Sequence, residues 1–209
     1  MSAAAFWDGL YADGNDGWEL GTPAPPLEAW LDAGGTFPAL HGSPRIAVPG
    51  CGRGHDARLL ARRGHRVWAF DFAEAAVTEA SRLAAADGVA VSVERRDVFT
   101  LGRDFAEAFD GVWEYTCFCA IDPARREEYA QVLHAILRPG GILLACFYPL
   151  REGGGGPPFP ISREDIVRAL DGRFDVLEAA EPARSVEGRR GLEWLVPRAA
   201  RLTVRDDAC

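Results

Sequence analysis

Short apolar runs separated by amphipathic segments recur along most of the chain. Five of these runs have the length and composition of buried strands: 45–49, 66–71, 90–94, 110–116 and 141–148. The last run, from Gly141 to Tyr148, is apolar throughout, as expected of a strand that is covered on both faces. A final pair of strands is expected at about 174–180 and 194–204.

Helix-length segments lie between these runs. The helix at 123–137 is expected to begin at Pro123, because proline suits the first turn, and to end before Arg138-Pro-Gly-Gly. Further helices are expected at 4–12, 24–32, 55–63, 73–86 and from Ser162 to Leu170. The alternation predicts an α/β fold: one Rossmann-like, doubly wound sheet, mostly parallel with an antiparallel closing strand. The length of 209 residues suits a single domain spanning 1–209.

A glycine-rich turn follows the first run. Residues 46–56 read Ile-Ala-Val-Pro-Gly-Cys-Gly-Arg-Gly-His-Asp, and the second run ends in Asp71, 21 positions after Gly50. A strand, a glycine turn, a helix and a second strand that ends in a carboxylate form the front half of a nucleotide-binding unit. The turn brings backbone N–H groups to the ligand, and the carboxylate accepts from the ribose hydroxyls.

The spacing of the glycines distinguishes between nucleotides. A dinucleotide site reads Gly-x-Gly-x-x-Gly, whereas Gly54 comes one residue early, which is the form found in S-adenosylmethionine (SAM) methyltransferases. An ordinary strand–helix turn is the alternative, and the in-register Asp71 argues against it. The same spacing disfavours a nicotinamide-dependent oxidoreductase.

Ligands of open α/β sheets lie beyond the carboxyl ends of the strands. Asp71 is placed there to accept from both ribose hydroxyls and Asp97 to accept from the adenine amino group, with Phe72 and Val98 against the adenine ring. A solvated loop carboxylate is the alternative for Asp97. The candidate cofactor-binding residues at the strand ends are Gly50, Cys51, Gly52, Asp71, Phe72, Asp97, Val98 and Tyr115.

Aromatic residues precede the first strand. Trp7 and Trp18 could close over the sulfonium of SAM, because a cation beside aromatic faces gains roughly 0.5–2 kcal/mol when desolvated. Leu20 is counted with them as a cofactor contact. Residues 1–35 are expected to form a helical lid over the cofactor; the alternative is that Trp7 and Trp18 only anchor helices on the core.

Four blocks of sequence resemble the thiopurine methyltransferase family of class I SAM-dependent methyltransferases, and within it the thiol and halide branch. The resemblance covers about residues 6–195 and implies SAM as cofactor, S-adenosylhomocysteine (SAH) as product, and cofactor contacts at most of the strand-end positions named above. In that branch aromatic residues before the first strand close over SAM, which implies cofactor contacts at Trp7, Tyr11 and Trp18. Glu114 departs from the branch, which usually has Asp there, and Tyr11 replaces a frequent tryptophan. The blocks are Val48–Asp56, Arg96–Thr100, Tyr115–Ile121 and Tyr148–Phe159.

The residues at the strand ends also bear on the methyl acceptor. A soft anion needs no general base for an in-line displacement, and the chain has no Lys and no His at the predicted strand tips apart from His55. We therefore expect a small soft nucleophile, a thiol or hydrosulfide ahead of a halide ion, oriented by Tyr115 and Tyr148 as catalytic residues. A thiopurine-like aromatic thiol, a selenium or tellurium species, another small metabolite, or SAM binding without catalysis remain alternatives.

The formal net charge of −8 and the absence of a basic patch argue against nucleic acid or an anionic membrane as partner. Arg189 and Arg190 are expected to be solvated, with binding of an acidic substrate as the alternative. Five cysteines, an odd number, do not indicate a disulfide framework, and Cys117-x-Cys119 lacks the further ligands of a metal site. Cys117, Cys119 and Cys146 are expected to be small buried hydrophobes. No leader or long apolar run is visible, so a cytoplasmic monomer is expected.

Overall fold

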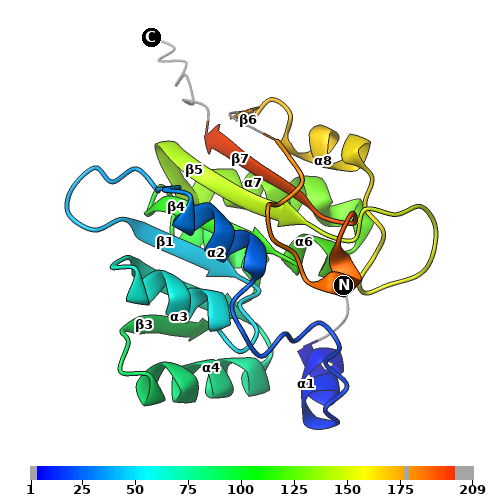
Figure 1. Ribbon diagram of the computed structural model, residues 1–209, viewed down its shortest axis with the longest axis horizontal. Helices are drawn as coiled ribbons and strands as arrows, with labels where there is room; N and C mark the ends of the chain where they lie inside the picture. The colour runs from blue at the N-terminus through cyan, green and yellow to red at the C-terminus, as the bar shows by residue number, and fades with distance from the viewer. Residues whose placement is uncertain (1–3, 177–178, 201–209) are drawn as a thin grey trace.

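The computed structural model describes residues 4–176 and 179–200, and its strands form one seven-stranded sheet of order β3-β2-β1-β4-β5-β7-β6 (Figure 1). The strands are β1 (Arg45–Pro49), β2 (Arg66–Asp71), β3 (Val91–Arg95), β4 (Phe109–Tyr115), β5 (Leu137–Phe147), β6 (Phe174–Val176) and β7 (Trp194–Ala200). Strands β1 to β5 pair in parallel, and β7 pairs antiparallel with both β5 and β6. The predicted doubly wound, mostly parallel sheet with one antiparallel strand in its closing pair is confirmed.

The predicted helices are present with small shifts of their ends. They are α1 (Ala4–Ala12), α2 (Pro25–Asp32), α3 (His55–Arg62), α4 (Glu74–Ala86), α7 (Arg126–Ile136) and α8 (Arg163–Leu170). Several single turns lie outside the predictions, since they are too short to show a helical period. These are α5 (Leu101–Asp104), α6 (Cys117–Ala120), η1 (Val98–Thr100), η2 (Pro123–Arg125), which replaces the first turn of the predicted 123–137 helix, and η3 (Glu187–Arg189).

Two predicted boundaries differ by several residues from the structure, and a third prediction extends beyond the described residues. Leu137, predicted as the last helical residue, begins β5 because it pairs with Phe109 of β4 ahead of a register shift. The predicted strand 174–180 is described as a strand only over Phe174–Val176. Residues 177–178 lie outside the described residues, and Ala180 forms an isolated bridge with Leu195. The predicted strand 194–204 is described as far as Ala200, and its last four residues lie outside the described residues.

Both faces of the sheet are covered by helices, α7 on one and α2 and α3 on the other (Figure 1). Adjacent residues of β4 show the division: Val112 packs in the cluster that contains Leu133 of α7, whereas Trp113 packs with Leu27 of α2 and Leu60 of α3. This explains why the predicted strands are apolar runs rather than alternating patterns.

The direction of β7 places its first residue, Trp194, beside Phe147 at the end of β5. The segment that enters β7 therefore lies at the same edge of the sheet as the carboxyl ends of the parallel strands. Among the described residues, no helix is long and apolar enough to cross a bilayer.

Candidate active site

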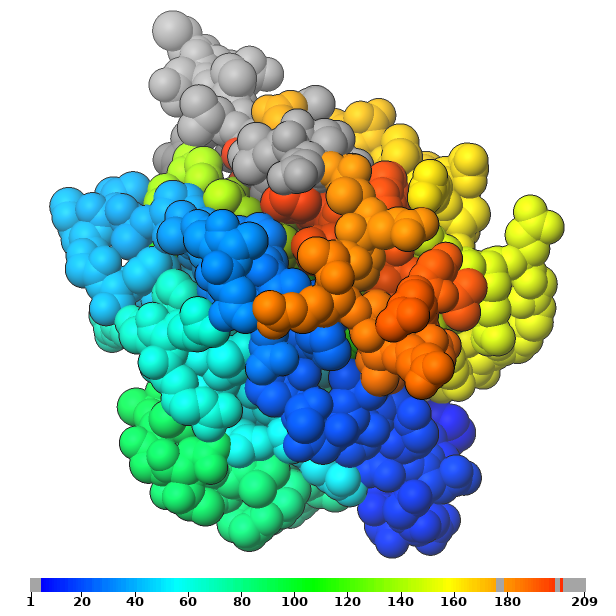
Figure 2. All heavy atoms as spheres, viewed as in Figure 1, coloured from blue at the N-terminus to red at the C-terminus, as the bar shows by residue number. Residues whose placement is uncertain are grey.

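A cavity of about 530 Å³ opens at the carboxyl edge of the sheet, a volume in the range of small-ligand sites. Its walls come from the N-terminal segment, the glycine turn, the ends of β2 and β4, and the segments around Tyr148 and Arg189. Figure 2 shows the N-terminal segment, in blue, directly beside the segment that precedes β7, in orange, and Arg189 donates to the carbonyl of Trp18 across this boundary at 2.8 Å.

The cavity brings together the residues singled out from the sequence, although they are spread over more than 140 positions. Their common location agrees with the rule for open α/β sheets. The contacts that each makes with a ligand remain predictions. Residues lining the cavity include Trp7, Tyr11, Trp18, Leu20, Gly50, Cys51, Gly52, Asp71, Phe72, Asp97, Val98, Tyr115 and Tyr148.

The glycine turn has the backbone conformation that its sequence requires. Gly50 and Gly52 have φ values of +61° and +52°, in the left-handed region that disfavours other residues. A side chain at Gly50 would also meet Cys117, whose Sγ lies 2.8 Å from the position of the added Cβ. Both glycines line the cavity, so the turn presents backbone to it, as a nucleotide site needs.

Asp71 connects the glycine turn to the start of α4. One carboxylate oxygen accepts from the Gly52 N–H at 2.9 Å and the other from the Ala73 N–H at 3.0 Å. Burial raises the pKa of Asp71, and these backbone donors oppose the rise. A carboxylate has about four lone-pair sites, so acceptor capacity remains for hydroxyl groups in the cavity that Asp71 lines.

Asp97 caps a short helix at the rim of the cavity. Its side chain accepts from the Phe99 N–H at 3.0 Å, which fixes the first turn of η1, and the residue is exposed. This arrangement is compatible with both sequence interpretations, a solvated capping carboxylate and an acceptor for the adenine amino group.

Three aromatic rings form one wall of the cavity. Trp18 lies edge-on to Trp7 and to Tyr11, with ring centres 5.2 and 5.5 Å apart, and its indole N–H donates to the Tyr11 hydroxyl at 3.4 Å. Burial, reinforced by the charge of Asp71, raises the pKa of Tyr11, so this hydroxyl stays protonated. The wall offers the ring faces and edges that the sequence predicted for a sulfonium.

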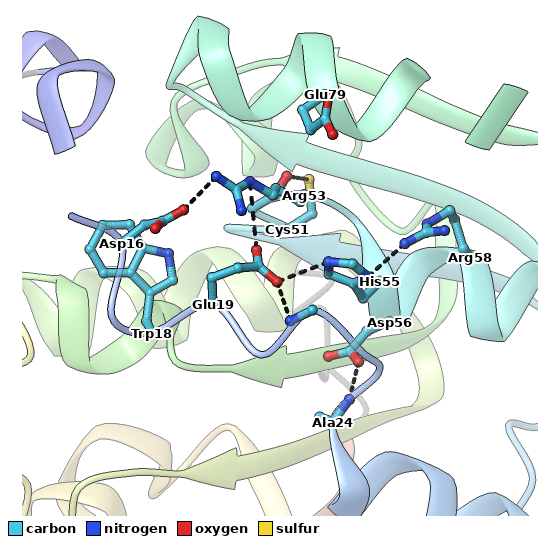
Figure 3. Close-up of polar contacts among 12 residues, drawn as sticks. Asp16, Trp18, Glu19, Ala24, Cys51, Arg53, His55, Asp56, Arg58 and Glu79 are labelled. Carbon is cyan, nitrogen blue, oxygen red and sulfur yellow. Dashed lines mark hydrogen bonds and ion pairs between the residues drawn. The ribbon is translucent and has the colours of Figure 1, made fainter. Parts of the chain in front are cut away.

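Residues 16–24, called the strap from here on, are attached to the glycine turn and α3 by charged groups (Figure 3). Arg53 pairs with Asp16 at 2.6 Å, and His55 contacts Glu19 through Nε2 at 2.8 Å. Arg58 donates to Nδ1 of the same imidazole, so the hydrogen-bond network assigns the proton to Nε2. Although burial opposes it, the hydrogen bonds from His55 and from the Gly21 N–H lower the pKa of Glu19.

The carboxylate of Asp56 holds the end of the strap. Asp56 accepts from the Ala24 N–H at 2.6 Å and from the indole N–H of Trp113 at 2.7 Å, and burial raises its pKa. Asp56 therefore joins the strap, α3 and β4 at the base of the cavity.

Arg189 corrects a prediction made from the sequence. Its side chain was expected in solvent but is only 7% exposed, because η3 turns back over the cavity before β7 begins; Arg190 is exposed as expected. One guanidinium nitrogen of Arg189 donates to the Tyr115 hydroxyl at 2.6 Å, and the carbon between its nitrogens lies 4.8 Å from the ring centre of Tyr148. A fixed positive charge thus stands between the two tyrosines.

Glu193 is a site residue that the sequence analysis missed. It is 1% exposed, and its Oε1 accepts a hydrogen bond from the Tyr115 hydroxyl with an oxygen–oxygen distance of 2.6 Å. Its Oε2 is buried without a hydrogen-bond partner. A signal was available: Glu193 directly precedes the last strand, and an antiparallel strand at the end of a parallel sheet starts at the ligand-binding edge.

Glu114 and the cysteines Cys117, Cys119 and Cys146 are buried in the protein. Glu114 accepts from the Phe118 N–H at 2.8 Å and the Tyr129 hydroxyl at 2.6 Å, and burial raises its pKa to about 7. Glu114 therefore holds β4 against α6 and α7. Burial likewise raises the pKa of the thiols, that of Cys119 to about 12, so they remain protonated. The described residues hold no group of three or more His, Cys, Asp or Glu suited to a metal ion.

Comparison with known proteins identifies the protein's family. The sequence profile described as thiopurine S-methyltransferase matches residues 2–203. The chain belongs to the thiopurine S-methyltransferase family. This confirms the family resemblance, and the protein is a SAM-dependent methyltransferase. The glycine turn, Asp71 and the aromatic wall fit SAM as cofactor, since they offer backbone donors, a carboxylate and aromatic rings around one cavity.

This thiopurine S-methyltransferase family member is also similar to individual relatives and to a solved structure. It is 31% identical over 197 residues to a probable thiol methyltransferase 2 of Arabidopsis thaliana, covering 93% of this chain and 84% of the relative. It is 30% identical to thiocyanate methyltransferase 1 of Brassica oleracea, covering 90% and 82%. The fold matches 1,6-didemethyltoxoflavin-N1-methyltransferase of Burkholderia thailandensis, crystallised with bound 1,6-didemethyltoxoflavin and SAH. The TM-score is 0.71 at 24% identity, and 95% of this chain and 86% of the other are covered.

Proposed function

We propose that this methyltransferase transfers the methyl group of SAM to a small soft nucleophile, a thiolate or hydrosulfide ahead of a halide or thiocyanate ion. The observation that carries the proposal is the buried guanidinium of Arg189, held between Tyr115 and Tyr148 in the same cavity as the glycine turn and Asp71. The cavity thus has a donor side at the ends of β1 to β3 and an acceptor side at the segments after β5 and before β7.

On the donor side, the proposal assigns the ribose hydroxyls to Asp71 and the adenine to the space between Phe72 and Val98. SAM supplies an electrophilic methyl group on a sulfonium. Trp7, Tyr11 and Trp18 stabilise that positive charge and exclude water from it, which is the role their ring contacts support.

On the acceptor side, Arg189 gives an anion a fixed partner and aromatic rings supply the rest of the surface. Soft anions such as thiolate or iodide suit this mixture of one cation and weakly polar walls. The Tyr115 hydroxyl donates its hydrogen bond to Glu193, so Tyr115 acts on the anion through Arg189. Arg189 also lies over the ring face of Tyr148. The names of the relatives, thiol and thiocyanate methyltransferase, support this acceptor class.

A thiopurine-like aromatic thiol is the second candidate. It is favoured by the family to which the chain belongs and by a cavity of about 530 Å³, which has room for more than a monatomic ion beside a cofactor. Pro157 and Pro158 line the cavity and would contact such a ring.

A screen of acceptors with SAM labelled in its methyl group tests the proposal. The acceptors are hydrosulfide, small alkyl thiols, iodide, bromide, thiocyanate, a thiopurine, selenium and tellurium oxyanions, and a large phenol and a large amine. We expect the highest turnover with hydrosulfide or a compact thiol and measurable turnover with iodide. Methylation confined to a large phenol or amine would overturn the proposal and leave the donor side standing.

Arg189→Met tests the acceptor side separately. Loss of the charged donor should raise KM for iodide by about tenfold or more, since a hydrogen bond to a charged group is worth about 1.5–3 kcal/mol. The dissociation constant for SAH should change much less. Arg190→Met is the matched control, because Arg190 is exposed. Equal KM values for iodide in both variants would remove Arg189 from the acceptor side.

A further inference from the structure

The hydrogen bonds around Tyr115 have a fixed direction. A guanidinium can only donate, so the Tyr115 oxygen accepts from Arg189, and a carboxylate can only accept, so the Tyr115 proton points to Glu193. Both donor–acceptor distances are 2.6 Å. The hydroxyl oxygen retains one lone pair at the wall of the cavity, and Oε2 of Glu193 is buried without a partner. The arrangement is a continuous path from the cavity to a buried carboxylate.

Such a path matters only for acceptors that carry a proton. An alkyl thiol has a pKa near 8.5, so only a few per cent of it is thiolate at neutral pH, whereas iodide and thiocyanate are ionised throughout. A neutral thiol must lose its proton as its sulfur is methylated. An enzyme that takes thiols efficiently at neutral pH therefore gains from a proton acceptor within reach.

Other groups at the cavity are less suited to this role. The carboxylate of Glu19 already interacts with His55 and the Gly21 N–H. The carboxylate of Asp56 already accepts hydrogen bonds from the Ala24 N–H and the Trp113 indole. The remaining lining carboxylates, Asp71 and Asp97, lie on the donor side at the ends of β2 and β3. Burial raises the pKa of Tyr115 itself, more than the nearby Arg189 lowers it, so the phenol is not the resting base.

We propose that Glu193 accepts the proton of a neutral thiol acceptor by way of the Tyr115 hydroxyl. The inference rests on the proposed function, since it concerns the same acceptor side. Proton-free anions would use the site without this path.

The step balances in atoms and charge. The thiol S–H bond breaks as its proton moves to the Tyr115 oxygen, and the former Tyr115 proton moves to Oε1 of Glu193. The electron pair left on the thiol sulfur forms the new bond to the methyl carbon, and the pair of the old carbon–sulfur bond stays on the sulfur of SAH. A positive donor, a neutral thiol and a negative Glu193 become a neutral thioether, neutral SAH and a neutral Glu193.

The groups that face this path set its charge. Arg189 from η3 contacts the ring of Tyr115. The charges of Glu193 and Arg189, and after them those of Asp56 and Glu114, act on the thiol of Cys146 in β5. Burial raises the pKa of Cys146 well above its usual value, so it does not compete for the proton at neutral pH.

Glu193→Gln tests the path while keeping an oxygen that accepts from Tyr115. In Glu193→Gln we expect the ratio of thiol turnover to iodide turnover at pH 6.5 to fall by about tenfold relative to wild type. Thiol turnover of this variant should rise about tenfold per pH unit below the thiol pKa, because the thiolate fraction rises by that factor. The wild type should show a much shallower rise. Glu187→Gln, the same change at an exposed position on η3, is the matched control. Tyr115→Phe, which interrupts the path and leaves Glu193 in place, should share the steep profile.

Proton counting provides a readout without turnover. Calorimetric titration of a small thiol into the wild-type SAH complex at pH 6.5, in buffers of different ionisation enthalpy, should show almost no proton release, because any proton lost stays on Glu193. Release of about one proton per thiol bound, or identical pH profiles for wild type and Glu193→Gln, would overturn the inference. A wild type that binds SAH but methylates neither thiol nor iodide would instead overturn the proposed function, and the inference with it.

Discussion

Single side chains at the carboxyl edge of the sheet combine structural and chemical roles. Asp71 holds the glycine turn and the start of α4 while lining the cavity, and Tyr115 joins Arg189 to Glu193. Substitutions at such positions separate the two roles only when the replacement keeps the shape of the side chain.

Asp71→Asn keeps that shape and loses the charge. We expect SAH binding to weaken by about 1.5–3 kcal/mol, the range for hydrogen bonds to a charged group. Isothermal titration calorimetry measures the change, and Glu107→Gln, remote from the cavity lining, serves as control. Unaltered affinity in Asp71→Asn would end its assignment to the ribose.

Glu114 gives a prediction for stability. Its folded-state pKa of about 7 lies above the ordinary value of 4.5, so the folded protein holds a proton that the unfolded chain releases between these values. The free energy of unfolding contributed by this group therefore falls as pH rises from about 4.5 to above 7. Glu114→Gln should remove this decline and raise stability at pH 8 by about 1–3 kcal/mol relative to wild type. Urea unfolding at pH 5 to 8 checks it, and parallel curves for the two proteins would contradict it.

At the scale of elements, the N-terminal region differs from the layers around the sheet. The strap is attached to the body through ion pairs and hydrogen bonds to Arg53, His55 and Asp56, and α1 through the bond from the Ala75 N–H to Asp8. Attachments of this kind reform more readily than buried apolar packing, which suits a segment that opens for the cofactor.

The lid prediction follows from these attachments. Amide hydrogen exchange over residues 5–22 should slow several-fold when SAH is added, because the ligand would contact the ring wall of Trp7, Tyr11 and Trp18. Exchange in α7 should respond much less, since its buried face lies in the core. Equal rates over 5–22 with and without SAH would make these residues core anchors only.

The sequence predicted elements whose signals are local. The glycine turn, the strand that ends in Asp71 and the six longer helices each follow from spacing or period within about 20 residues. Arg189 and Glu193 could not be placed in this way, because their burial depends on how η3 and the start of β7 fold back onto residues more than 70 positions earlier. The short helix α6 also escaped prediction, since its one turn is set by Glu114 accepting from the Phe118 N–H.

For the whole molecule, the cavity lies where the N-terminal segment, the sheet and the segment before β7 meet, so ligand binding should stabilise the fold. SAH at about 100 times its dissociation constant adds about 2.7 kcal/mol, which corresponds to a rise in Tm of about 5–10 °C for a chain of this size. NAD at the same concentration should leave Tm unchanged. Scanning calorimetry distinguishes the two, and an equal response to NAD would contradict the interpretation of the glycine spacing.

The antiparallel entry of β7 at the carboxyl edge has a consequence for how this architecture can diversify. The proposed donor side is encoded before residue 100. Of the proposed acceptor-side residues, Tyr115 belongs to β4, whereas Tyr148, Arg189 and Glu193 belong to the stretch that links β5 to β7. One contiguous piece of gene could therefore be exchanged between relatives as a cassette, carrying a new acceptor preference onto an unchanged cofactor half. Lineages of such enzymes would then diverge in acceptor chiefly through their last third.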